Sequence, residues 1–337
     1  MSMTRLCVGV DVAQATLAVH VCTPDKTPRG SRTLENRRAG FAELARWARQ
    51  LATATGCESI HVGLEATGVY GQALAAYLYQ ADGITVSVIN PAQIKYAARS
   101  NGARTKTDRT DAAEIAVFVA EKTPPPWAPE SPAVIHLRAL VDRLEQLKAM
   151  RTQERNRRHA VTHGAHAAPD VLASIEESLA AIQQQIDTLQ GRLRRHLEAH
   201  AELKQQTDLL QTIDGIGEWT AARLIAQAGR ALVERDARQL VAHAGLAPGK
   251  KESGTSVRAP AHIVKVGRSG LRLALYMPAV VGKKHNPVLR ALYQRILAKG
   301  RPRLVAIVAC MRKLLHIIHG VLKTQTPFNP ALHLTSA

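Results

Sequence analysis

The stretch RLCVGVDVAQATLAVHVCT, residues 5–23, decides the fold of the N-terminal part of this 337-residue chain. Two apolar runs of β type, 5–13 and 15–23, follow each other directly, and a shorter, more polar run lies near SRTLEN (31–36). The pattern predicts three successive strands at the start of the chain.

The segments that follow alternate between helix and strand signals. A helical spacing of apolar residues or a strand-like apolar run is found, in order, at 38–54, 59–67, 70–80, 84–90 and about 108–121. The complete order is βββαβαβα, which predicts a mixed sheet of five strands covered by helices. This is the layout of the ribonuclease H class, so we expect residues 1–122 to form an α/β domain of this kind.

Proline marks the end of this domain. The segment TPPPWAPESP (123–132) cannot continue a helix, and we expect a linker at 123–134. Beyond it, leucines and isoleucines recur three and four residues apart, with a break at HGAHAAPD (163–170), which predicts two long helices within 135–208. Two arrangements are open: a helical hairpin inside one domain, or a coiled-coil arm that packs against another subunit.

The formal charge of +18 is concentrated near the C-terminus. Residues 1–134 hold 14 Lys and Arg against 12 Asp and Glu, and 135–208 hold 11 against 10, whereas 209–337 hold 20 against 5. No acidic residue follows Glu252, while 14 basic ones do. Such a segment repels itself unless a polyanion neutralises it, so nucleic acid is the expected partner, and a merely soluble cationic surface is the alternative. Because aromatic residues make up only 4% of the chain, we expect phosphate contacts to outweigh base stacking.

Membrane and disulfide-rich classes are disfavoured. The longest apolar run near the C-terminus, 304–311, is too short to span a bilayer, and Asp11 interrupts any apolar core of a signal peptide. The four cysteines show neither CxxC pairing nor zinc-ligand spacing. We therefore expect free thiols in a cytoplasmic protein.

From residue 209 onward the chain is expected to be mainly helical with glycine breaks. IDGIGEWTAARLIAQAG (213–229) places Gly215 and Gly217 before an amphipathic helix and resembles a helix-hairpin-helix element, in which amides approach a phosphate; a plain glycine turn is the alternative. AGLAPGKK (244–251) has one residue too few between its glycines for a phosphate-binding loop and lacks the following Ser or Thr, which excludes nucleoside triphosphate binding there.

Four acidic residues are expected to converge in the N-terminal domain. Asp11 ends the first strand, and Glu65 lies in the fourth, its neighbour in the proposed sheet. Asp108 and Asp111, three residues apart, share one face of a helix. Either aspartate could cap this helix, but capping does not account for all four positions. Carboxylates gathered in this way repel each other, and Mg²⁺, which prefers carboxylate oxygens, removes the repulsion. Magnesium is therefore the expected cofactor. The neighbouring basic residues, expected to face the phosphates of a nucleic acid, are Arg104, Lys106 and Arg109.

Motifs along the chain resemble those of one family. They are GVDVA (9–13), LEATG (64–68), VINPAQIKYAARSNG (88–102), KTDRTDA (106–112), IDGIG (213–217), AGLAP (244–248), ESGTSVR (252–258) and GLRLALYMPA (270–279). In this order and spacing they are similar to the DEDD transposases of bacterial insertion sequences, the insertion-sequence-110 family, over nearly the whole chain.

The resemblance implies a DNA transposase or recombinase with a RuvC-like N-terminal domain, a coiled-coil connection and a C-terminal transposase domain at 209–337. It implies that the four acidic residues bind Mg²⁺ and that Ser253 is the nucleophile that joins covalently to a DNA strand end. It also implies a tetramer, in which a serine of one subunit completes the acidic site of another, and a structured bridge RNA that selects target and donor DNA. The basic residues expected to contact nucleic acid in this half of the chain are Lys250, Lys251, Arg258, Lys265, Arg268 and Arg272.

Two other functions are open from the residues themselves. A metal-dependent nuclease or Holliday-junction resolvase of the same fold would use water as the nucleophile, with Ser253 inert. A non-catalytic nucleic-acid scaffold would use only the basic C-terminal region. A serine hydroxyl needs a base or a metal to activate it, and because no nearby histidine motif offers that base, the acidic site is its expected activator.

Overall fold

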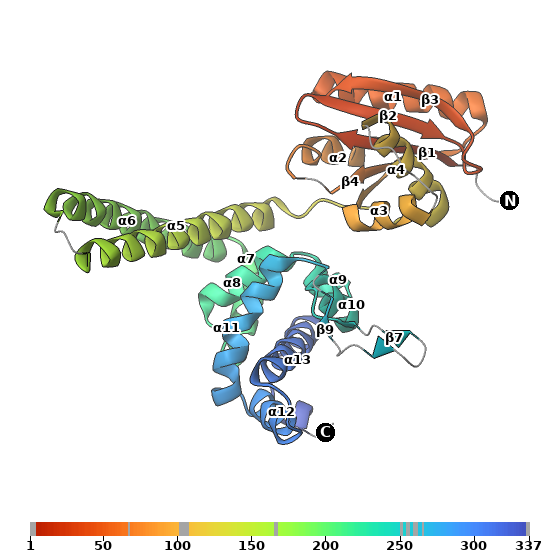
Figure 1. Cartoon of the computed structure of the whole chain (residues 1–337). Coiled ribbons are helices and arrows are strands. Elements are labelled where there is room, and N and C mark those ends of the chain that lie inside the picture. The colour runs from red at the N-terminus through yellow and green to blue at the C-terminus, as the bar shows by residue number, and fades with distance from the viewer. Residues whose placement is uncertain are drawn as a thin grey trace. The chain divides into compact units, whose positions relative to one another are not determined.

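The computed structural model describes residues 5–66, 68–100, 108–164, 168–249, 252–253, 257–258, 262–264 and 266–334. Of residues 98–100, 108–109, 252–253, 257–258 and 333–334 it describes the backbone alone. The chain forms two compact units, Met1–Pro129 and Glu130–Ala337 (Figure 1). The first is a mixed α/β unit, and the second is mostly helical.

A five-stranded sheet forms the centre of the first unit. Its strands are β1 (Arg5–Val12), β2 (Thr16–Cys22), β3 (Pro28–Glu35), β4 (Ser59–Glu65) and β5 (Ile84–Ile89), in the spatial order β3-β2-β1-β4-β5. β1, β4 and β5 run parallel, while β2 is antiparallel to both β1 and β3. The predicted five-stranded mixed sheet is confirmed, and so are the helices α1 (Arg38–Thr55), α2 (Gln72–Tyr79) and α4 (Asp108–Lys122).

One helix of this unit was not predicted. α3 (Pro91–Ser100) follows β5 directly, and its start is held by the Asn90 side chain, whose Oδ1 accepts a hydrogen bond of 2.9 Å from the Ala92 amide. Asparagine at the cap followed by proline at the first helical position is a helix-start signal, and it was present in the sequence.

The two faces of the sheet pack against different helices. Leu6, Val8 and Val10 alternate along β1 and lie in one core cluster with apolar residues of α1 and α2. Cys7, on the opposite face, lies in a second cluster with Ile115 and Val119 of α4 and with Ile94 of α3. The strand alternation thus assigns every second side chain to the face that α4 covers. All four cysteines are free thiols, as predicted.

The proline-rich segment after α4 is packed against the first unit. The Trp127 amide donates a hydrogen bond of 2.7 Å to the carbonyl of Val86 in β5, and the Trp127 ring meets Tyr79 edge-on at 6.1 Å between centroids. Ser87 Oγ donates to the Pro125 carbonyl over 2.8 Å. On the other side of the boundary, Glu130 pairs with Arg138 and accepts a hydrogen bond from the Arg230 amide. The segment expected as a linker is therefore anchored at both ends.

The second unit begins with a long helical hairpin. α5 (Pro132–Thr162) and α6 (Pro169–Ala199) pack on each other. This is the helical hairpin, the first of the two arrangements left open by the sequence. Leu137 and Leu144 of α5 and Ile186 and Leu193 of α6 belong to the same buried cluster as the helices that follow. The base of the hairpin is therefore part of the core of this unit.

In the part of the second unit that the structure describes, the remaining elements are helices and four two-residue strands. The helices are α7 (Ala201–Gln211), α8 (Glu218–Ala228), α9 (Ala231–Glu234), α10 (Ala237–His243), α11 (Ser269–His285), α12 (Pro287–Ala298), α13 (Arg303–Thr324) and α14 (Ala331–Leu334). β6 (Pro248–Gly249) pairs with β9 (His262–Ile263), and β7 (Glu252–Ser253) pairs with β8 (Val257–Arg258). Within the described chain, α13 is the one helix long and apolar enough to cross a membrane. Its buried face supplies Ile307, Leu314 and Ile318 to the core, which is the arrangement of a core helix.

Candidate active site

Asp11 and Glu65 lie at the same edge of the sheet. Asp11 is the penultimate residue of β1, and Glu65 is the last residue of β4. The two strands are parallel neighbours, with Val10 opposite Leu64. Because parallel strands end at the same edge, their carboxyl ends bring the two half-buried acidic residues together there.

Both side chains also project from the same face of the sheet. Gly9 precedes Asp11 by two residues, and Gly63 precedes Glu65 by two, so each glycine shares a face with the acid that follows it. A Cβ on Gly9 would overlap the carbonyl oxygen of Ala112 in α4, and a Cβ on Gly63 would lie 3.1 Å from Ile115 of the same helix. Asp11 and Glu65 therefore project from the face that α4 covers.

The direction of α4 brings its first turn to this edge. Glu121, near the end of the helix, forms an ion pair of 2.5 Å with Lys26, which lies in the turn between β2 and β3. Thr123, just beyond the helix, accepts a hydrogen bond of 2.8 Å from Arg5, the first residue of β1. The end of α4 thus lies at the start of β1, and its beginning lies at the end of β1, beside Asp11.

Asp108 and Asp111 occupy this first turn, at positions i and i+3. The Asp111 side chain is half-buried, and the backbone of Asp108 is the first residue of the helix. The four acidic positions chosen from the sequence therefore come to one edge of the sheet and to one of its faces, from three different elements.

Carboxylates of this kind form a donor set that suits Mg²⁺, which takes oxygen ligands. Among the side chains that the structure describes, which exclude that of Asp108, no three His, Cys, Asp or Glu groups form a metal-binding cluster. The chemical type of the donors therefore fits a divalent ion, while the described side chains, those of Asp11, Glu65 and Asp111 included, are not gathered closely enough to hold one.

Ser253 belongs to the second unit. It lies in β7, opposite Val257 of β8, so of the two pairs between these strands it belongs to the one next to the connecting residues 254–256. Glu252 is opposite Arg258 in the same pair. The side chains of these residues and of Arg109 are outside the description, and the other predicted basic residues that lie wholly outside it are Arg104, Lys106, Lys250, Lys251 and Lys265.

Arg268 and Arg272, predicted to contact nucleic acid, donate hydrogen bonds within the second unit. Arg268 Nη1 donates to the Gln227 carbonyl over 2.7 Å, and Arg272 Nη1 donates to the Ala244 carbonyl over 3.0 Å. Both bonds connect the segment around the start of α11 to the helices before it. The two guanidinium groups therefore have a structural role, which the sequence did not indicate.

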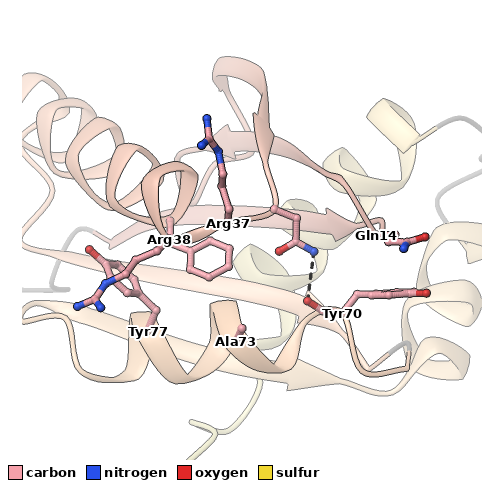
Figure 2. Close-up of a pocket in the computed structure, with 8 residues that line it drawn as sticks. Gln14, Arg37, Arg38, Tyr70, Ala73 and Tyr77 are labelled. Carbon is pink, nitrogen blue, oxygen red and sulfur yellow. Dashed lines mark hydrogen bonds between the residues drawn. The ribbon is translucent and has the colours of Figure 1, made fainter.

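A pocket at the acidic edge was not predicted from the sequence. It has a volume of about 530 Å³, and three loops that leave the edge, after β1, β3 and β4, contribute to it (Figure 2). Asn36 joins these loops, because its Nδ2 donates to the Ala13 carbonyl over 2.8 Å and to the Tyr70 carbonyl over 3.3 Å. The sequence signal was the presence of polar and aromatic residues just after three strand ends. The residues that line the pocket are Gln14, Asn36, Arg37, Arg38, Phe41, Tyr70, Ala73 and Tyr77.

Comparison with known proteins adds family evidence to this geometry. The profile of DEDD transposases of IS110 elements matches residues 8–166, and that of the transposase IS116/IS110/IS902 family matches residues 207–294. The pilin gene-inverting protein of Moraxella bovis is 33% identical over 335 residues, which cover 98% of this chain and 100% of that protein. The insertion element IS110 uncharacterized 43.6 kDa protein of Streptomyces coelicolor is 29% identical over 166 residues, 49% of this chain and 40% of that protein.

Among solved structures, T. thermophilus RuvC in complex with a Holliday junction substrate aligns with 34% of this chain and 92% of its own, at 12% identity and a TM-score of 0.26. The full-length similarity to the Moraxella bovis protein and the two family profiles decide the class. The chain belongs to the IS110 family of transposases, enzymes that act on DNA.

Proposed function

We propose that this enzyme is an RNA-guided DNA recombinase that cuts and rejoins strands through a covalent phosphoserine intermediate. The observation that supports the proposal is that Asp11, Glu65 and the first turn of α4, which contains Asp108 and Asp111, lie at one edge of the five-stranded mixed sheet. Phosphoryl transfer needs charge neutralisation at the reacting phosphate, and such an edge is suited to it.

In this proposal the four acidic residues hold Mg²⁺, which when bound would neutralise charge on the phosphate and favour ionisation of the attacking hydroxyl. Ser253 is the nucleophile. Its Oγ forms a bond to phosphorus while the bond from phosphorus to one sugar oxygen breaks, and that oxygen leaves with a proton as a free hydroxyl. Attack by the hydroxyl of another strand end reverses the step, so the energy of the phosphodiester bond is conserved and no other energy source is required.

Two observations favour recombination over hydrolysis by water. The Moraxella bovis relative, aligned over its whole length, is named for inverting a pilin gene, and an inversion requires the cut ends to be joined again. The chain also keeps Ser253 beside Lys250, Lys251 and Arg258, where positive charge would hold a phosphate. A water-using nuclease or junction resolvase is the second candidate, because the acidic edge belongs to the first unit and does not include Ser253.

The partners follow from charge and family. The region after Glu252 has 14 basic and no acidic residues, which supports binding of a polyanion. On the family resemblance we extend the proposal to target and donor DNA, a structured bridge RNA and a tetramer in which Ser253 of one subunit meets the acidic edge of another.

Labelled DNA incubated with the enzyme, its element's RNA and Mg²⁺ tests the proposal on a denaturing gel. The wild-type protein and Ser256→Ala, a matched change three residues further along the chain, should retain label on the protein, whereas Ser253→Ala should retain none. Adduct formation by Ser253→Ala at the wild-type level would refute the assigned nucleophile. Cleavage by the wild-type protein without any adduct would instead establish the water-using nuclease, and nucleic-acid binding without cleavage would establish a scaffold.

A further inference from the structure

The pocket beside the acidic edge has walls of two chemical kinds. Phe41 and Tyr77 form an aromatic wall, with ring centroids 5.8 Å apart and planes tilted by 55°. Tyr70 is 46% exposed, so its ring is available to a ligand. In Figure 2, Arg38 and Tyr77 lie at one end of the pocket, and Gln14 and Tyr70 lie at the other.

The positive charge of the pocket comes from Arg38. Arg37 is paired with Glu35, and its side chain points away from the labelled residues at both ends (Figure 2). Arg38 is exposed and forms no ion pair with any residue that the structure describes. None of the residues that line the pocket is acidic. An unpaired guanidinium at one end of a pocket and the exposed ring of Tyr70 with the Gln14 amide at the other are suited to a phosphate attached to a planar base.

Two of the loops that form the pocket directly follow the strands that carry Asp11 and Glu65. Asn36 connects the loop after β1 to the loop after β4 through its two hydrogen bonds. Ala13 follows Asp11 by two residues, and Tyr70 follows Glu65 by five. The aromatic wall belongs to the face covered by α1 and α2, whereas the carboxylates project from the face covered by α4. A strand that crosses the edge would therefore meet the carboxylates on one side and the pocket on the other.

From this arrangement we infer that the pocket holds one unpaired nucleotide of the DNA strand that is cut, close to the phosphodiester at the acidic edge. The base lies against the exposed ring of Tyr70, Arg38 binds the adjoining phosphate, and the Gln14 amide contacts the base edge. A volume of about 530 Å³ accommodates one nucleotide but not a base pair with its two backbones. The inference rests on the proposed function at one point only, the identification of the bound strand as the DNA strand that is cut.

Binding of single-stranded DNA to the full-length protein tests the pocket without any reaction. The probes are oligonucleotides with 2-aminopurine at one position at a time, and EDTA is present so that no strand is cut. Stacking on an aromatic ring quenches this base. We expect quenching at one position, lost in Tyr70→Ala and retained in Tyr70→Phe. Tyr70→Ala should weaken binding roughly tenfold to a hundredfold, since each stacked base contributes that much to affinity.

Arg38→Gln gives an independent measure, because it keeps the ring of Tyr70. The variant should bind the same DNA more weakly, and the dependence of its affinity on salt concentration should correspond to about one phosphate contact fewer. Arg46 is an exposed arginine of α1 outside the pocket, so Arg46→Gln should change neither quantity. Unchanged binding in both Tyr70→Ala and Arg38→Gln would overturn the inference. So would an RNA oligonucleotide of the same sequence that loses affinity in these variants while the DNA does not.

The two proposals fail in different assays. Failure of the phosphoserine step would abolish the covalent adduct but leave the quenching in EDTA intact. Failure of the pocket would leave the adduct and remove the site-specific quenching. Melting temperatures of the variants should equal that of the wild type, since Tyr70 and Arg38 are both exposed.

Discussion

Gly9 of β1 lies directly beneath Ala112 of α4, so closely that a Cβ on Gly9 would overlap the Ala112 carbonyl oxygen. The approach of helix to sheet at this point fixes the height of α4 above β1. Asp111 precedes Ala112, and Asp11 follows Gly9 by two residues, so the same contact fixes the spacing of two of the acidic side chains.

The first prediction concerns this contact. Gly9→Ala should push α4 away from the sheet and lower the free energy of unfolding by about 3 kcal/mol, since the overlapping atom is backbone and cannot turn aside. Metal-dependent DNA cleavage should fall as well. Gly191→Ala in α6 is the matched control, because nothing lies within 4 Å of its added Cβ, and it should stabilise the protein by up to about 1 kcal/mol. Urea denaturation measures both; equal stability of Gly9→Ala and wild type would show that the contact is not maintained in solution.

The proposed metal site predicts how Mg²⁺ affects stability and activity. Asp111→Asn keeps the size of the side chain but removes one of the charged oxygen ligands that Mg²⁺ prefers. Mg²⁺ should raise the melting temperature of the wild type and have less effect on the variant, because a ligand stabilises only the state that binds it. Cleavage should fall by about a hundredfold or more. Asp82→Asn, an exposed aspartate of the same unit, should change none of these; full activity of Asp111→Asn in the absence of Mg²⁺ would contradict the assigned metal role.

His61 predicts how stability depends on pH. It is buried in β4, 3% exposed, and its Nε2 lies 2.8 Å from Ser87 Oγ. Because Ser87 donates its proton to the Pro125 carbonyl, the imidazole must donate to Ser87. Burial, and secondly the nearby Arg5, lowers the pKa of His61 to about 4. As the pH falls, His61 is therefore protonated near pH 6.5 in the unfolded chain but only near pH 4 in the folded chain.

Stability from this group is complete above about pH 6.5 and decreases as the pH falls towards 4, by at most about 3 kcal/mol. Urea midpoints measured at pH 7.5, 6 and 5 check the direction. His61→Gln keeps an N–H donor without the titration, so its midpoint should vary less over this range. An equally steep pH dependence in the variant would assign the effect to other groups.

Arg268 should contribute to the stability of the second unit. Its bond to the Gln227 carbonyl connects the start of α11 to α8, so Arg268→Ala should lower the free energy of unfolding by about 1 kcal/mol. Arg295→Ala, which removes an exposed arginine from α12, should change it by less than about 0.5 kcal/mol. Denaturant titration compares the two variants, and equal stability of Arg268→Ala and the wild type would contradict the structural role of this guanidinium.

The features predicted correctly from the sequence have local causes. Strand alternation around Asp11 and Glu65 and the start of a helix at Asp108 are set by neighbouring residues, so their positions at one edge followed from the element order. The docking of Trp127 on β5, the carbonyl partners of Arg268 and the pocket around Asn36 join residues far apart in sequence. Periodicity contains no information on such pairs, and the sequence therefore missed all three.

The anchored proline segment has a mechanical consequence. The chain is held by β5 at Trp127 and by Arg138 and the Arg230 amide at Glu130, so Ala128 and Pro129 alone separate the two attachment points. Few rotatable backbone bonds lie between these points, and the ring of Pro129 fixes one of them, so the backbone here has little conformational freedom.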